Sequence, residues 1–374
     1  GIALDGTKLA ASRTGGMYYS FKVYDCFRRL PRFRVDHDGI SSLSPRMWSW
    51  MIKLHLVSLY LLIMRGSRRY KYIFVSGAWG IPEYLLFSKW RGSKIVAFWH
   101  HRTSLQPELG ARDRFIWRLK EWCQLKMADR TVVVSKSTLN SIRELGFDGD
   151  DYVLAANGLD KDVWIDRTTG YDPSKPGFKV VCVASITRNK GIMDLLVAFA
   201  DFLDTIEDSE ERSGIILDIV GQEIDSALTS ELRGVICDRG LKDNVFLRGR
   251  RRLQELMSYY RAASVFVHPS HYEGYGIVVL EAASFGLPII VSNGGALPEV
   301  VNDGQYGLVY PVSDRAALRQ QLARVYRDGA LRDALSAKAA ELYRAAITWE
   351  ESGRLSEAYL GRMEDAPNFR AGEA

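Results

Sequence analysis

The stretch Glu273–Glu281 reads EGYGIVVLE and carries two carboxylates with seven residues between them. The first lies on a glycine-containing loop, and the second lies within an apolar run that stops at Gly286 and Pro288. A glycine and then a proline after an apolar run are typical of a helix C-terminus. The pattern therefore predicts a helix that begins just after Glu273 and carries Glu281 about two turns from its start.

The spacing of the two carboxylates limits their chemistry. At about 1.5 Å per residue, eight residues place them roughly 12 Å apart along a helix axis. This is wider than the roughly 5–9.5 Å that separates the carboxylates of a glycosidase. This separation suits two carboxylates that bind the two ends of a nucleotide-sugar. The diphosphate would then lie at the helix N-terminus, where free N–H groups favour an anion.

Ordered signals surround this stretch. Pro269-Ser270 precedes it, and the sequence after it contains Gly286-x-Pro288, Gly294-Gly295, Pro298-Glu299 and Gly304-x-x-Gly307. From His268 to Pro311 the chain resembles the donor-binding signature of retaining glycosyltransferases of family 4. The resemblance implies an α/β protein of the GT-B fold, in which two Rossmann-like α/β domains with parallel sheets face each other across a cleft.

The resemblance also implies roles for this segment. The carboxylate of Glu281 would accept hydrogen bonds from the ribose hydroxyls, and that of Glu273 would face hydroxyls of the transferred sugar. The backbone of Gly274, Tyr275 and Gly276 would cap the phosphates. We therefore expect Glu273 in the catalytic centre and the other four residues in donor binding.

Cations are needed to neutralise the leaving diphosphate. Lys190, which precedes Gly191, matches the lysine of the family, but Ser185 stands where the family usually has an arginine. Arg188 either supplies that charge from another place or is an exposed loop residue, and removal of one such contact typically costs roughly 2–4 kcal/mol. Arg250 lies in a loop that matches a base-reading loop of the family, and it contacts base or phosphate or lies on the surface.

Further candidates lie in the first half of the chain. Gly15 and Gly16 resemble the glycine loop of the family, where small residues let the backbone approach a ligand. His100 ends a predicted strand and matches a histidine that contacts the sugar, and the adjacent His101 could exchange roles with it. Asn157, in an Asn-Gly pair, matches a further family landmark.

Two series of strand-like runs indicate two domains, as the length of 374 residues also does. We predict an N-terminal acceptor-binding domain over residues 1–166, a linker over 167–177 and a C-terminal nucleotide-sugar-binding domain over 178–349. In the family a helix, here about 350–374, crosses back onto the first domain. The predicted strands are Ile2–Leu4, Tyr72–Ser76, Ile95–Phe98, Thr131–Val134 and Tyr152–Ala155, then Lys179–Val183, Ile215–Val220, Val245–Leu247, Val265–His268, Ile289–Val291 and Leu308–Tyr310.

The net charge of +5 conceals a strong asymmetry. Residues 1–170 hold 27 basic and 16 acidic side chains, a net of +11, and the remainder holds 23 and 29, a net of −6. A basic half can face anionic lipid, nucleic acid or an acidic acceptor, or be a solvated surface. Aromatic residues among the basic ones favour an anionic membrane surface. Met47–Met64 is the one transmembrane candidate, and because Lys53 and His55 interrupt it we predict a buried helix.

Other function classes receive less support. Four separated cysteines without a C-x-x-C indicate a reducing compartment and no zinc site. The first residues lack the pattern of a signal peptide, and no D-x-D motif ends a strand, so we expect neither a divalent metal nor a cofactor. No nucleic-acid-binding module is present.

We therefore expect a cytoplasmic enzyme, peripheral on the inner face of the plasma membrane, that acts in bacterial cell-surface polysaccharide synthesis, including lipopolysaccharide. It would transfer a hexose from a UDP- or GDP-sugar to a glycan or lipid-linked acceptor with retention and without metal. Retention permits double displacement or front-face attack. The alternatives are a nucleotide-sugar epimerase or hydrolase on the same fold, or a scaffold with reduced catalysis.

Overall fold

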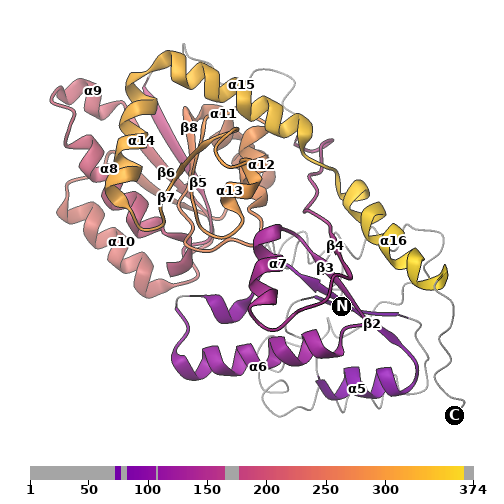
Figure 1. Cartoon of the computed structure of the whole chain (residues 1–374). Coiled ribbons are helices and arrows are strands. Elements are labelled where there is room, and N and C mark those ends of the chain that lie inside the picture. The colour runs from indigo at the N-terminus through magenta and orange to yellow at the C-terminus, as the bar shows by residue number, and fades with distance from the viewer. Residues whose placement is uncertain (1–71, 77–81, 107, 165–176, 366–374) are drawn as a thin grey trace, which may run out of the picture. The chain divides into compact units, whose positions relative to one another are not determined.

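The computed structural model describes residues 72–76, 82–106, 108–164 and 177–365. The chain divides into two compact units (Figure 1). The first contains the described residues of Gly1–Ser104, Gly110–Gly158 and Ile347–Ala374, and the second contains Leu105–Leu109 and Leu159–Ala346. The predicted strand Ile2–Leu4, the glycines Gly15 and Gly16 and the predicted helix Met47–Met64 lie outside the described residues.

The first unit contains a parallel sheet with the order β1-β2-β3-β4. Its strands are β1 (Tyr72–Ser76), β2 (Lys94–Trp99), β3 (Arg130–Val133) and β4 (Tyr152–Leu154). Its helices are α5 (Pro82–Trp90), α6 (Ala111–Met127), α7 (Lys136–Arg143) and α16 (Trp349–Asp365), and a 3-10 turn spans Thr103–Leu105.

Alternate residues of β2 face opposite sides of this sheet, as the pleat requires. Val96 and Phe98 pack with Tyr359 and Leu360 of α16. Trp99, on the other face, belongs to the cluster formed with α6 and α7. The C-terminal helix is therefore part of the first unit.

The second unit contains a six-stranded parallel sheet. Its strands are β5 (Phe178–Val183), β6 (Ile215–Val220), β7 (Val245–Gly249), β8 (Val265–His268), β9 (Ile289–Ser292) and β10 (Leu308–Tyr310). Its helices are α8 (Ile192–Leu203), α9 (Ser209–Ser213), α10 (Ser226–Asp238), α11 (Leu253–Ala262), α12 (Ile277–Ala283), α13 (Leu297–Val300), α14 (Arg315–Arg327) and α15 (Gly329–Ala345), with a 3-10 turn at Arg188–Lys190.

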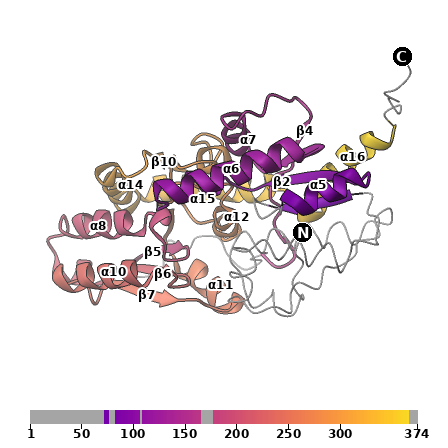
Figure 2. The same cartoon turned by 90° about the horizontal axis from the view of Figure 1, so that it is seen from below.

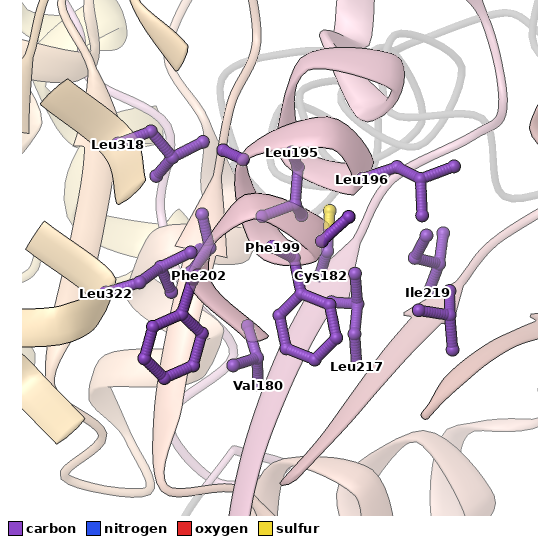
Figure 3. Packing of buried hydrophobic residues seen from close by; sticks show 14 of the residues in the cluster. Val180, Cys182, Leu195, Leu196, Phe199, Phe202, Leu217, Ile219, Leu318 and Leu322 are labelled. Carbon is purple, nitrogen blue, oxygen red and sulfur yellow. The ribbon is translucent and has the colours of Figure 1, made fainter. Parts of the chain in front are cut away.

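Both faces of this sheet are covered. On one face Val180 and Cys182 of β5 pack against Phe199 and Phe202 of α8, with α14 beside them (Figure 3). On the other face Val181 belongs to the cluster formed with α11, α12 and α13. Burial on both faces explains why the strands of this unit are continuous apolar runs rather than alternating ones.

The strand order is β10-β9-β8-β5-β6-β7, which is the doubly wound order of a dinucleotide-binding fold. The chain winds outward from β5 through β6 to β7, and then returns to place β8 on the other side of β5. The helices that follow β5 and β8 therefore lie on opposite faces of the sheet, and the loops that lead into them lie at the topological switch point, where open α/β sheets bind their ligands.

One boundary between the two units falls between Gly158 and Leu159 in the sequence. This point precedes the polar stretch 167–177 that the sequence indicated as the linker. Leu159 and Trp164 belong to the core of the second unit, where the ring of Trp164 packs edge-on against Tyr260 and Phe285. Burial of these two apolar side chains ties residues 159–164, which were predicted to end the first domain, to the second unit.

Candidate functional site

Two loops of the second unit meet at the switch point of its sheet. One follows β5 and ends at Gly191, and the other follows β8 and ends at Gly276. The backbone N–H of His271 donates to the carbonyl of Asn189 at 2.8 Å, and the hydroxyl of Ser270 donates to the same carbonyl at 3.2 Å. A Cβ at Gly191 would lie 2.0 Å from the carbonyl oxygen of Pro269, so only glycine permits this approach.

A third loop, which follows β9, packs against the loop that follows β8. Gly295 follows β9 with a φ of +63°, and a Cβ there would lie 2.2 Å from the carbonyl oxygen of Glu273. The N–H of Ala296 donates to that same carbonyl at 2.8 Å. Gly295 and Ala296 thus fix the backbone position of Glu273.

Lys190 and Glu273 form an ion pair across the two loops. Lys190 Nζ lies 2.6 Å from Glu273 Oε2, and His268 Nε2, at the end of β8, donates to the same oxygen at 3.1 Å. The side chains of Lys190 and Glu273 are only 22% and 19% exposed. Burial by itself would raise the pKa of the Glu273 carboxyl, but the charge of Lys190 and the hydrogen bond from His268 hold this pKa well below its usual range. Glu273 is therefore a carboxylate at neutral pH.

A second cluster of charged side chains connects the loop that follows β8 to helices α8 and α14. Asp194, in the first turn of α8, accepts from His271 Nε2 and from Arg315 Nε, each at 2.7 Å. The hydrogen bond from His271 and then the cation Arg315 lower the pKa of Asp194, against the effect of its burial. Asp194 thereby joins the Glu273 loop to α8 and α14.

Glu281 lies in α12, which has only seven residues and begins at Ile277. Glu281 is therefore little more than one turn into the helix, instead of the predicted two, because the helix starts only after the left-handed Gly276 at φ 92°. The hydroxyl of Tyr260 donates to Glu281 Oε2 at 3.1 Å. Burial and the nearby Glu281 raise the pKa of Tyr260 well above its usual value, so Tyr260 remains a donor.

The residues between the two carboxylates are packed closely. Gly274 and Gly276 are buried, and a Cβ at Gly276 would lie 2.8 Å from the side chain of Leu297. Tyr275 is partly buried against the apolar core, and its burial raises the pKa of the phenol to about 12.

The predicted arginines take different positions. Arg188 Nη2 lies 2.6 Å from Glu231 Oε1 of α10 and Arg188 Nε lies 3.7 Å from Asp225 Oδ2, so its guanidinium is directed at α10. Lys190, two residues later, reaches Glu273. Arg250 is exposed, whereas its neighbour Arg248 pairs with Asp218 at 2.6 Å and lies 4.0 Å from the ring centroid of Phe246. The structure thus gives Arg188 and Arg248 defined structural partners.

Among the described residues, three predicted site residues lie in the first unit. His100 directly follows β2 and is partly buried, and its burial and the neighbouring His101 lower its pKa well below the ordinary value. His101 is also partly buried. Asn157 is buried beside Gly158, at which a Cβ would lie 2.2 Å from the backbone nitrogen of Trp349.

Sequence reasoning did not identify His268, His271, Asp194 and Arg315 as parts of this site. His268 and His271 flank Pro269-Ser270, so their proximity to Glu273 was a signal that could have been used. Asp194 and Arg315 are separated by 121 positions, and their contact depends on the packing of α8 against α14. Within the described part of the chain, no group of three or more His, Cys, Asp or Glu side chains is arranged to hold a metal ion.

Two family models match this chain in succession. The model described as Glycosyltransferase Family 4 matches residues 21–163, and that described as Glycosyl transferases group 1 matches residues 171–342. The chain belongs to glycosyltransferase family 4. Among curated relatives, a D-inositol 3-phosphate glycosyltransferase of Streptomyces bingchenggensis is 36% identical over 39% of this chain and 32% of its own length. An alpha-maltose-1-phosphate synthase of Mycolicibacterium smegmatis is 29% identical over 55% of this chain and 56% of its own length.

Solved structures share the GT-B fold of this family 4 chain. Sucrose-phosphate synthase from Thermosynechococcus elongatus superimposes with a TM-score of 0.73 at 21% identity, over 95% of this chain and 94% of its own. HepE of Anabaena, in complex with UDP and glucose, gives a TM-score of 0.67 at 17% identity, over 83% and 82%. The match to the first two curated relatives spans only 32% and 40% of their lengths.

Proposed function

We propose that this family 4 chain is a retaining glycosyltransferase that moves a hexose from a nucleoside-diphosphate sugar to a glycan or lipid-linked acceptor. The observation that carries the proposal is the Lys190–Glu273 pair at the switch point of the second sheet, with Glu281 on the helix that follows. A cation and two carboxylates suit a ligand with a charged diphosphate between two hydroxylated ends. HepE, which shares the fold, was solved with UDP and glucose, so a UDP-sugar is the first donor to test.

Lys190 would stabilise the charge that develops on the leaving diphosphate. An ammonium group has three N–H donors, and the contact with Glu273 uses one of them. Lys190 could therefore retain Glu273 and also contact a phosphate oxygen. Preorganised charge of this kind, in a site shielded from water, is often the largest single contribution to catalysis.

Glu273 would orient the sugar and not attack it. The same oxygen, Oε2, meets both Lys190 and His268, and the low pKa makes this carboxylate a weak base. We therefore favour front-face attack, in which a phosphate oxygen of the leaving group takes the proton of the acceptor hydroxyl, over double displacement through Glu273. The protein then contributes position and charge.

We further propose that the enzyme needs neither a metal nor a cofactor and acts at the cytoplasmic face of a membrane in bacterial cell-surface polysaccharide synthesis. The excess of basic over acidic side chains in residues 1–170 supports an anionic surface as partner. No helix in the described part of the chain is both long enough and apolar enough to cross a bilayer.

The testing experiment measures binding of UDP, GDP, ADP and dTDP by calorimetry, with Mg²⁺ and with EDTA, to the wild type and to Glu281→Ala. We expect one nucleotide to bind without metal and to bind at least about tenfold more weakly to the variant, since a charged hydrogen-bond partner is lost. Equal binding to both proteins would exclude the proposed ribose contact. Release of free sugar from the preferred donor without any acceptor would instead favour a hydrolase.

A further inference from the structure

Helix α6 of the first unit has apolar side chains on its outer side as well as its inner one. Phe115, Ile116, Leu119 and Trp122 are 69%, 38%, 52% and 45% exposed. At 100° per residue, Phe115, Leu119 and Trp122 follow one stripe along the helix at positions i, i+4 and i+7. Side chains of this size are normally buried, so their clustering on one exposed side indicates an interaction surface.

Basic residues share this side of α6. Arg112, Arg118 and Lys126 are exposed, and the helical spacing places them between and beside the four apolar side chains. The helix has two carboxylates, and neither lies on the stripe of Phe115, Leu119 and Trp122: Asp113, which is exposed, lies about 160° around the axis from Phe115, and Glu121 is buried. We call the seven residues Arg112, Phe115, Ile116, Arg118, Leu119, Trp122 and Lys126 the outer face of α6.

The inner side of α6 is held firmly in the unit. Glu121 forms a buried ion pair with Arg102 at 3.1 Å and accepts from the backbone of Ser104 at 2.9 Å. Leu125 packs in the cluster that contains Trp99 of β2. These contacts fix the rotation of α6 about its axis, so its outer face is a stable feature of the surface.

Helix α5 extends this surface. It lies beside α6 in both views (Figures 1 and 2), and Lys89 Nζ donates to the carbonyl of Met127 at 3.1 Å. Leu86 and Trp90, one helical turn apart on α5, are also exposed. The two neighbouring helices together present several large apolar side chains.

We propose that the outer face of α6 docks the protein on an anionic lipid bilayer, with Phe115, Leu119 and Trp122 in the headgroup region and the basic residues against lipid phosphates. A face with exposed aromatic residues, interleaved cations and no carboxylate is the composition of an interfacial helix. A protein partner of ordinary composition would not require this absence of acidic groups, whereas a negative surface does. The inference deepens the proposed membrane-bound acceptor and rests on it, but its test needs no sugar donor.

The test measures co-sedimentation of the full-length protein with vesicles of phosphatidylcholine alone or with 30% phosphatidylglycerol. We expect the wild type to bind the anionic vesicles and to be released by salt, because the contact is partly electrostatic. Phe115→Ala/Trp122→Ala and, separately, Arg118→Glu should weaken partitioning at least about tenfold, since each removes a principal contribution. Leu355→Ala, at an exposed apolar residue of α16 in the same unit, is the matched control and should bind as the wild type does.

Two results would overturn the inference: wild-type protein that does not co-sediment with anionic vesicles, or α6 variants that co-sediment with them as the wild type does. A change in oligomeric state, or a large loss of thermal stability, in Phe115→Ala/Trp122→Ala would show that protein covers this face instead. Nucleotide binding, measured on the same samples, separates the two proposals, because the residues proposed to hold the donor phosphates and ribose are in the second unit. α6 variants that still bind nucleotide but no longer bind vesicles would support both proposals.

Discussion

Replacement of Lys190 by methionine tests the electrostatics of the site without the need for a substrate. Methionine keeps most of the volume of the side chain and removes the charge that faces Glu273 at 2.6 Å. Removal of one partner from a fully buried ion pair costs about 3–5 kcal/mol, and an exposed pair is worth about 0–1 kcal/mol. With 22% and 19% exposure this pair is nearer the first limit, so we expect a loss of about 2–3 kcal/mol in the free energy of unfolding at pH 7.

The pH dependence of this loss follows from the pKa of Glu273. In the wild type the folded pKa is lower than the unfolded one, so the carboxylate contributes stability above the unfolded pKa, about 4.3, and this contribution is lost as pH falls towards the folded pKa. Without Lys190, burial raises the folded pKa of Glu273. Protonation at acid pH then removes the buried, unpaired charge of Glu273, so the variant loses less stability there. The difference in stability between the two proteins should therefore shrink as pH falls from 6 towards 3.

Scanning calorimetry of the full-length protein measures the effect. For a domain of this size, 1 kcal/mol corresponds to about 2–4 °C in Tm, so the transition of the second unit should fall by about 4–12 °C at pH 7. Arg233→Met is the matched control, because its pair with Glu223 at 3.0 Å has side chains 61% and 33% exposed. The reasoning would be refuted by equal shifts in the two variants, or by a difference that does not change with pH.

The remaining predictions use the same unit. Gly295→Ala should lower the free energy of unfolding in urea by at least about 2 kcal/mol more than Gly240→Ala. Both glycines have a positive φ, but only at Gly295 does a carbonyl oxygen lie 2.2 Å from the new Cβ. Equal losses in the two variants would contradict the close approach at Gly295. Asp194→Asn should destabilise by about 1–3 kcal/mol and weaken nucleotide binding by calorimetry, and unchanged binding would show that the cluster does not position the site. In a transferase assay Lys190→Met should lower kcat about 30- to 1000-fold and Arg188→Ala much less, since Arg188 pairs with Glu231; the reverse order would assign the phosphate contact to Arg188.

Local sequence determined which segments form which elements. The runs Tyr72–Ser76, Ile215–Val220, Val265–His268 and Leu308–Tyr310 have the predicted bounds, because continuous apolar runs between turn residues are recognisable without tertiary context. The family and its GT-B fold were likewise predicted, since Lys190-Gly191 and the segment 268–311 are contiguous patterns. The helix of Glu281 was predicted too, but not its late start at Ile277, which depends on the backbone conformation of Gly276.

Tertiary structure alone decided how these pieces meet. Lys190 and Glu273 are 83 positions apart and touch because the strand order places β8 beside β5. Neither residue carries information about the other in its local sequence, and the same holds for Asp194 and Arg315. Arg188, two residues from Lys190, is directed to α10 because the 3-10 turn separates the directions of neighbouring side chains. Which side of α6 is buried was also open from sequence, because its apolar residues lie on both sides, and only packing on the sheet selects one.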